Sequence, residues 1–313
     1  MRSSASAPGK AVLLGEHFVM HGSGAVLCAI NRRVTVTAEE AGGGMIRISS
    51  GVGSLEAPAG GDPRDVGPEL RPLYHIALAA GTGVDITVDS EVPPGAGLGS
   101  SSACCVACAG AVLGLRGGAS RGEALRLASE AERTAFPGAS GADCAACARG
   151  GVILWDGRIR AVRPGPGLRV AVADSGQRHS TREAVGRVSK YRGADPAGFG
   201  RALEEVGRMV GEAPAQIEAG DEAGLGAAMS RNHALLREAG ASTPGLERII
   251  SVAGGASAGA KLTGAGGGGC AIALDGTGRA AEALRGAGFG CFESGMDNEG
   301  LIVFNGTGGR AGA

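Results

Sequence analysis

The sequence has few aromatic residues, which make up 3% of its 313 positions. Few aromatic rings leave little material for stacking nucleic-acid bases or for building an aromatic cage around a ligand. Charge is nearly balanced, since 30 Lys and Arg face 31 Asp and Glu, and no block of basic residues stands out. The chain therefore has no evident electrostatic attraction for nucleic acid or for an anionic membrane, and its expected partners are small molecules.

Long hydrophobic runs are also missing. Near the N-terminus the apolar run Ala11–Leu14 is far shorter than a membrane span or the core of a secretion signal. We therefore expect a cytoplasmic protein with no membrane contact. The hydrophobic content of 43% over 313 residues is sufficient for a sizeable core, in two domains or one large one.

Cysteine is present, but its spacing argues against a metal site. Cys105 and Cys108 form one CxxC pair, and Cys144 and Cys147 form another. The gap between the pairs, residues 109–143, is longer than the roughly 15–20 residues of a zinc ribbon, and both pairs lie in apolar stretches. Because a buried free cysteine behaves as a small hydrophobe, we favour tight helix packing over the alternative of a zinc or redox role.

Glycine, by contrast, is abundant, with 60 of 313 residues against a usual share of about 7%. A glycine run alone, such as Gly266–Gly269, therefore carries little information. Another glycine-rich segment is more informative because several features coincide there. It follows the strand-like VDITVDSEV, it contains two prolines and three serines, and it leads into an apolar helical stretch.

This segment, residues 93–103, is typical of a phosphate-binding loop. Its glycines allow positive φ and a close approach of the backbone to a ligand. The helix that follows offers free N–H groups and the positive end of its dipole to an anion. The lysine of GxxxxGK[ST] and the full GxGxxG spacing are both absent, so it matches neither common nucleotide motif. The predicted loop consists of Pro93, Pro94, Gly95, Ala96, Gly97, Leu98, Gly99, Ser100, Ser101, Ser102 and Ala103.

The hydrophobic pattern predicts an α+β protein with a division near residue 165. The glycine- and proline-rich segment 163–167 is read as a linker, and the tail 306–313 is expected to be frayed. In the first part we predict strands at 8–14, 25–38, 45–50, 83–91 and 151–157, and helices at 101–115, 120–134 and 141–148. In the second part we predict strands at 168–174, 260–263, 270–274, 288–294 and 300–304, and helices at 180–191, 198–217, 221–238, 244–254 and 278–287.

Three segments carry chemically reactive residue types. Lys10 precedes Glu16 and His17 in one short span, Glu132 and Asp143 bracket a Pro-Gly turn, and 261–270 reads KLTGAGGGGC. Two carboxylates around a loop are able to hold Mg²⁺ and to orient or deprotonate a hydroxyl. Each feature alone also has an ordinary explanation, namely a solvated lysine, a polar turn, a salt bridge, a helix-capping Asp and a hairpin.

Taken together and in this order, APGKAVLLGEH, PPGAGLGSSSA and KLTGAGGGG resemble the three motifs of the GHMP kinase superfamily over nearly the whole chain. Within it the resemblance is greatest to the mevalonate kinases, in the opening SAPGKAVLLGEHFVMHG and in the SGxD-like segment Ser140–Asp143. Homoserine kinases and diphosphomevalonate decarboxylases have a different first motif. Galactokinases share GEH but continue with a threonine-aspartate signature that Phe18 and Val19 do not provide.

The resemblance implies two domains, residues 1–165 like ribosomal protein S5 domain 2 and residues 166–313 ferredoxin-like, with ATP and the substrate in the cleft between them. The implied activity is ATP- and Mg²⁺-dependent phosphorylation of the 5-hydroxyl of (R)-mevalonate in isoprenoid biosynthesis, by a homodimer. The alternatives are another small-molecule kinase of the superfamily, acting on phosphomevalonate or a sugar, and a catalytically silent nucleotide-binding sensor on the same fold.

The resemblance also implies a role for individual residues. Asp143 matches the catalytic aspartate and Lys10 the active-site lysine beside it, while Ser101 and Glu132 match the magnesium ligands. Residues implied to bind substrate are Lys10, Glu16, His17, Asp143, Arg178, Thr181, Gly264 and Ala265, with Arg182 as second choice for the cation that meets the carboxylate. Two positions depart from the mevalonate kinase pattern, Cys144 where asparagine is usual and Cys104 near a position that is often aromatic.

Overall fold

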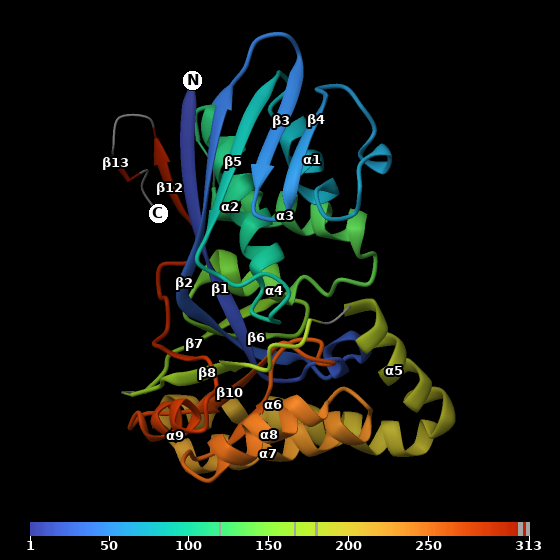
Figure 1. The fold of residues 1–313 in the computed structure, drawn as a ribbon, viewed down its shortest axis with the longest axis vertical. Helices are drawn as coiled ribbons and strands as arrows, with labels where there is room; N and C mark the ends of the chain where they lie inside the picture. Colours follow the sequence, from blue (N-terminus) through green and yellow to red (C-terminus); the bar gives the residue numbers. More distant parts are fainter. Residues whose placement is uncertain (119, 166, 179–180, 306–308, 311–313) are drawn as a thin grey trace.

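The computed structural model describes residues 1–118, 120–165, 167–178, 181–305 and 309–310 (Figure 1). Its described elements form two layered parts that follow one another along the chain, each with a sheet covered by helices (Figure 1). One continuous cluster of buried apolar side chains extends through both parts, from Ala5 to Val303. Residue 166 of the linker segment and most of the tail lie outside the described residues.

The first part contains a large sheet and four α-helices among its described residues. Its elements are β1 (Arg2–Leu14), η1 (Phe18–His21), β2 (Ala25–Glu40), β3 (Met45–Ser50), β4 (Gly53–Pro58), η2 (Pro63–Asp65), α1 (Arg71–Leu78), β5 (Val84–Ser90), α2 (Ser100–Leu115), α3 (Arg121–Ala135), α4 (Ala142–Arg149), β6 (Val152–Trp155) and β7 (Ile159–Val162).

The central strands β1 and β2 are long and antiparallel, and β2 also pairs with β5 at one end and with β6 at the other. The register between β1 and β2 shifts between Pro8 and Lys10, since Pro8 faces Arg33 and Lys10 faces Ala29, so β2 carries the extra residues there. Such an irregularity interrupts the ladder of hydrogen bonds beside Pro8, which has no N–H to donate.

Helix α2 is buried on nearly all sides because its residues are small and apolar. A side chain at Gly110 would meet Ala5 Cβ at 3.0 Å, so only glycine allows α2 this close to β1. The CxxC pairs lie on α2 and on the adjacent helix α4, and all four thiols are buried. Their burial fits the packing interpretation.

The second part carries its helices on one face of a four-stranded sheet with the order β11-β8-β10-β9, seen in the lower half of Figure 1. The chain order β-α-β-β-α-β and this strand order are those of a ferredoxin-like fold, with α5 to α8 between the first two strands. The elements are β8 (Val170–Asp174), α5 (Thr181–Ala194), α6 (Pro196–Ala219), α7 (Glu222–Glu238), α8 (Pro244–Gly254), β9 (Ala260–Leu262), β10 (Cys270–Leu274), α9 (Arg279–Gly286), β11 (Cys291–Ser294), β12 (Ile302–Asn305) and β13 (Gly309–Arg310).

The α+β class and the two-part organisation are therefore confirmed. In the first part the sequence pattern missed β4, β7 and α1. Strand β4 is an exposed edge strand with glycine and proline at its ends, and α1 has eight residues, so neither carries a long periodic signal. The last described strands, β12 and β13, do not stay with the second sheet, because β12 pairs with β1 in the first. No helix in the described part of the chain is long and apolar enough to cross a membrane.

Candidate active site

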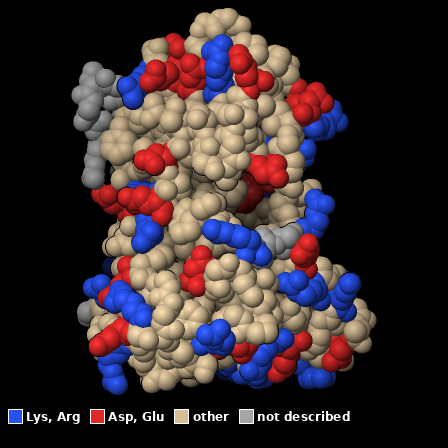
Figure 2. Space-filling model, viewed as in Figure 1, with Lys and Arg blue, Asp and Glu red and all other residues tan. Residues whose placement is uncertain are grey.

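A cavity of about 420 Å³ lies where the two parts meet, and Figure 2 shows the surface hollowed at this level. Its lining comes from β1, the 93–103 loop, the turn between α3 and α4, the first turn of α5 and the 264–265 loop. Segments that are far apart in the sequence therefore converge on one space, as the three sequence motifs predicted.

The 93–103 loop is held by backbone hydrogen bonds on both sides. Lys10 N donates to Leu98 O at 2.9 Å, and Cys270 N donates to Ala96 O at 2.9 Å. The non-helical part of this segment ends at Gly99, which is the N-cap residue of α2 and has a left-handed φ of 72°. A side chain on Gly99 would meet Lys10 Cγ at 2.8 Å, so glycine is needed for the lysine to pass over the loop. The free N–H groups at the start of α2 thus lie at the cavity beside a cation.

Lys10 and Asp143 form an ion pair at the centre of the cavity. Lys10 Nζ lies 3.0 Å from Asp143 Oδ2 and also donates to Gly97 O at 3.0 Å. The Lys10 side chain is 2% exposed, whereas that of Asp143 is 40% exposed and open to the cavity. Burial alone would lower the pKa of Lys10, but the charge and hydrogen bond of Asp143, with smaller effects of Cys147 and Glu16, raise this pKa overall. Lys10 is therefore charged and fixed against a carboxylate that a ligand can reach.

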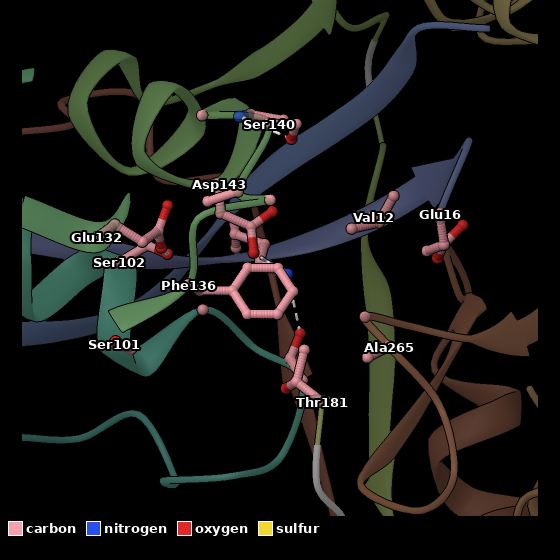
Figure 3. A pocket seen from close by; sticks show the side chains of 18 of the residues that line it. Val12, Glu16, Ser101, Ser102, Glu132, Phe136, Ser140, Asp143, Thr181 and Ala265 are labelled. Atoms are coloured by element: carbon pink, nitrogen blue, oxygen red, sulfur yellow. Dashed lines mark hydrogen bonds and ion pairs between the residues drawn. The ribbon is translucent and has the colours of Figure 1, made fainter. Parts of the chain in front are cut away.

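Glu132 lies next to this pair with both carboxylate oxygens hydrogen-bonded to protein donors. Ser102 Oγ donates to Oε1 at 2.5 Å, and Cys144 Sγ donates to Oε2 at 3.7 Å. Figure 3 shows Glu132 and Ser102 adjacent at one end of the cavity, on α3 and α2. Burial, and then the nearby Asp143 charge, raise the pKa of Glu132. Ser101 also lines the cavity, but it is exposed and lies one position before the serine that contacts Glu132.

At the other end of the cavity, Glu16 is buried and forms an ion pair with Lys261. Its neighbour His17 has a left-handed φ of 61°, and its Nε2 lies 2.8 Å from Ala265 O. Because a carbonyl only accepts, Nε2 carries a proton. Burial lowers the pKa of His17, so its ring is neutral near pH 7.

Most residues implied to bind substrate line this cavity, and Arg178 does not. Thr181, at the start of α5, and Gly264 and Ala265 line it together with Glu16 and His17. Arg178 instead donates from Nη1 to Pro94 O at 2.7 Å, so it contacts the outer part of the 93–103 loop. Among the described lining residues, Lys10 is the one lysine or arginine.

Comparison with known proteins agrees with these motifs. The GHMP kinases N terminal domain family matches residues 70–151, and the GHMP kinases C terminal family matches residues 215–289. A mevalonate kinase of Aeropyrum pernix is 40% identical over 288 residues, covering 86% of this chain and 87% of that protein. The chain belongs to the mevalonate kinase family of the GHMP kinases.

Two further relatives support this assignment. A mevalonate kinase of Methanothermobacter thermautotrophicus is 38% identical to this kinase, with 87% of this chain and 90% of that protein covered. The crystal structure of the Methanococcus jannaschii mevalonate kinase superposes with a TM-score of 0.80 at 25% identity, covering 94% of this chain and 98% of that one. As a GHMP kinase, the chain is a phosphotransferase that uses ATP.

Magnesium, which the family resemblance implies, is compatible with the oxygen donors of this kinase. Glu132, Asp143 and the serine hydroxyls are hard donors, and the two carboxylates are close enough for one to raise the pKa of the other. The described residues contain no cluster of three or more His, Cys, Asp or Glu side chains arranged to enclose a metal ion. Such a partial set suits Mg²⁺, which usually binds one or two carboxylates and completes its coordination with phosphate and water.

Residues that sequence reasoning did not assign complete this site. Ser102 was placed in the loop but not at Glu132, because a run of serines does not show which hydroxyl faces inward. Lys261 begins the third motif, yet its partner Glu16 lies 245 positions away. Asn232, on α7, accepts a hydrogen bond from Gly15 N at 3.2 Å and had no motif to mark it.

Proposed function

We propose that this kinase transfers the γ-phosphoryl group of ATP to the 5-hydroxyl of (R)-mevalonate, giving 5-phosphomevalonate and ADP. The observation that carries the proposal is the Lys10–Asp143 ion pair, set in the cavity beside the N-terminus of α2. The substrate comes from the mevalonate kinases that are 38–40% identical to it over most of their length.

In this proposal Asp143 orients the acceptor hydroxyl and accepts its proton as the O–P bond forms. Phosphoryl transfer passes through a loose transition state, so positioning and charge neutralisation contribute more than covalent help. Lys10 supports both, since its ammonium holds the Asp143 carboxylate in place and offsets charge on the transferred group. The 40% exposure of Asp143 leaves that carboxylate accessible to a hydroxyl.

The donor side is assigned to the 93–103 loop and to Glu132. The N–H groups at the start of α2 bind phosphate oxygens, with Ser100, Ser101 and Ser102 beside them. Ser101 and Glu132 are the proposed magnesium ligands, and Ser102 holds the Glu132 carboxylate in place. When bound, Mg²⁺ would neutralise charge on the β- and γ-phosphates.

The acceptor side is assigned to Glu16, His17, Thr181, Gly264 and Ala265, which line the cavity on the side of the second part. Oxygen Oε2 of Glu16 is buried without a hydrogen-bond partner among the described residues, so it is the oxygen left for an acceptor hydroxyl.

Arg178 is our choice for the cation that binds the carboxylate of the acceptor, reaching it from its position at Pro94, and Arg182 is the second choice. Arg178→Ala should raise KM for mevalonate more than Arg182→Ala does.

A panel of acceptors in a coupled ADP-release assay tests the substrate. We expect turnover with mevalonate and little with phosphomevalonate, galactose or homoserine. Turnover with another panel member and none with mevalonate would assign the chain to a different branch of the superfamily. ATP binding without turnover on any acceptor would favour a catalytically silent sensor, which the presence of Lys10, Glu132 and Asp143 argues against.

A cytoplasmic location, expected from the lack of long apolar runs, and a homodimer, implied by the resemblance, both stay proposals. Neither a nucleic acid nor a membrane is proposed as a partner, given the balanced charge. Light scattering of the purified protein measures the mass in solution, and the mass of a single chain would contradict the dimer.

A further inference from the structure

Each residue of the turn at 15–17, which follows β1, has a polar contact with the second part of the molecule. Gly15 donates its N–H to Asn232 on α7, Glu16 pairs with Lys261 on β9, and His17 contacts Ala265. None of these three partners is within 200 positions of the turn in the sequence. The acceptor side of the cavity therefore depends on contacts that cross between the two parts.

Lys261 is the most constrained member of this group. Its side chain is fully buried, and its ammonium donates to Leu262 O at 2.7 Å and to Val12 O at 3.4 Å as well as to Glu16. A lysine ammonium has three protons to donate, so these acceptors use its capacity. Lys261 does not line the cavity among the described residues, whereas Glu16 does. It therefore reaches a ligand only through Glu16 and the turn.

Asn232 is equally buried, at 0% exposure, and uses its Oδ1 to accept the Gly15 N–H. Gly15 itself has a φ of 101°, and a side chain there would meet Gly24 O at 2.4 Å. The backbone of the turn is strained at His17, a non-glycine residue with positive φ. Such a segment keeps its shape only where its surroundings impose it.

We propose that Lys261 and Asn232 are positioning residues, which hold the 15–17 turn so that Glu16 Oε2 and the His17 ring are set toward the acceptor. The proposal rests on the function proposed above only in taking the acceptor to be mevalonate. Lys261 fixes the carboxylate by its charge and its three contacts, and Asn232 fixes the backbone one residue earlier. In the part of the chain that the structure describes, the hydrogen bonds and the ion pair of Lys261 and Asn232 go to Val12, Gly15, Glu16 and Leu262, and none goes to α2 or Glu132.

The test compares Lys261→Met with Lys190→Met, which removes the exposed lysine on α5 and serves as the matched control. In Lys261→Met we expect KM for mevalonate to rise by about 10-fold or more, because a small misplacement of a binding group is costly. KM for ATP should change by less than about twofold, since the donor side is untouched. Lys190→Met should change neither constant.

A purely structural role for Lys261 predicts a lower melting temperature with both KM values unchanged, and that result would overturn the proposal. Where Lys261→Met does not fold, Asn232→Ala replaces it, because it frees the Gly15 N–H and leaves the Glu16–Lys261 ion pair intact. This variant should fold and still show the raised KM for mevalonate alone. Normal KM values in it would equally count against positioning.

Hydrogen exchange separates failure of this inference from failure of the proposed function. Even if mevalonate is not the acceptor, the Gly15 amide should exchange faster in Asn232→Ala and in Lys261→Met, while amides of α2 keep their protection. Unchanged exchange at the turn in both variants would overturn the positioning role whatever the substrate is. Absence of mevalonate turnover in the wild-type protein would overturn the proposed function alone.

Discussion

Individual side chains in this kinase have their chemistry set by where the backbone places them. Lys10 lies where the register between β1 and β2 shifts and is buried against Asp143, and Glu132 is held by Ser102 and Cys144. The resemblance alone suggested the pairing of Lys10 with Asp143, and the structure places their charged atoms 3.0 Å apart. The resemblance could not indicate that Cys144 donates to Glu132, because asparagine is usual at this position and the motif does not show where a thiol there would point.

Asp143→Asn should separate binding from catalysis. The amide keeps the shape of the side chain but cannot accept the hydroxyl proton, so we expect turnover to fall by about 10²-fold or more with ATP affinity nearly intact. Steady-state kinetics with varied ATP measure both quantities. Turnover equal to that of the wild type would remove Asp143 from its role as base.

His17 should make the free energy of unfolding depend on pH. In the unfolded chain a histidine takes up a proton near pH 6.5, whereas burial lowers the pKa of His17 in the folded protein. Its contribution is therefore present above pH 6.5 and is lost as pH falls toward the lowered pKa. Urea unfolding at pH 7.5 and 5.5 measures this loss, which should be smaller in His17→Gln. An equal loss in both proteins would show that His17 protonates as readily when folded.

Among the elements, two glycine-rich loops matter most, namely the 93–103 loop and the loop at 263–269. They are in direct contact at Gly97 and Thr263. Gly97 has a φ of 80°, and a side chain there would meet Thr263 O at 2.5 Å. Gly95, in the same loop, also has positive φ, but a side chain there would meet nothing within 4 Å. The two positions share the backbone penalty and differ in the contact with the second loop.

Gly97→Ala should therefore weaken ATP binding and lower stability more than Gly95→Ala does. Both variants carry the cost of a side chain at positive φ, about 1–2 kcal/mol, and Gly97→Ala must also push the loops apart. KM for ATP and urea unfolding measure the two effects. Equal behaviour of the two variants would mean that the loops do not need their close contact.

The sequence allowed most elements and all three motifs to be predicted, because long periodic segments and glycine-serine patterns are local signals. It did not predict the contacts of Lys261, Asn232 and Ser102, because each acts through a partner that is distant in sequence or through the direction in which it faces. Strand β4 was missed because edge strands need little hydrophobic character.

The molecule as a whole is closed by contacts between its last segment and its first sheet. Arg33 on β2 pairs with Asp297, and it donates to Ser6 O at 2.9 Å and to Gly300 O at 2.5 Å. The Arg33 side chain is 20% exposed and that of Asp297 is 10% exposed, so the pair is well shielded from water. This network holds the chain leading into β12 against β1 and β2.

Arg33→Ala should lower the free energy of unfolding by about 3 kcal/mol, because it leaves the Asp297 carboxylate unpaired in a shielded place. The control is Arg47→Ala, since Arg47 pairs with Glu56 on an open surface where both side chains are about half exposed. We expect that variant to lose under about 1 kcal/mol. Urea unfolding followed by the fluorescence of Trp155 gives both values, and similar losses would mean that the Arg33 network contributes little.

The return of β12 to β1 also has a consequence for biosynthesis. While the polypeptide emerges from the ribosome, the Ser3–Ser6 edge of β1 has no neighbour until residues 302–305 have been made. The same nascent chain lacks the Lys261 partner of Glu16 for most of its synthesis. An open strand edge can pair with other chains, so protection by a chaperone would be most useful during this interval. The acceptor side of the site should be completed only late in translation.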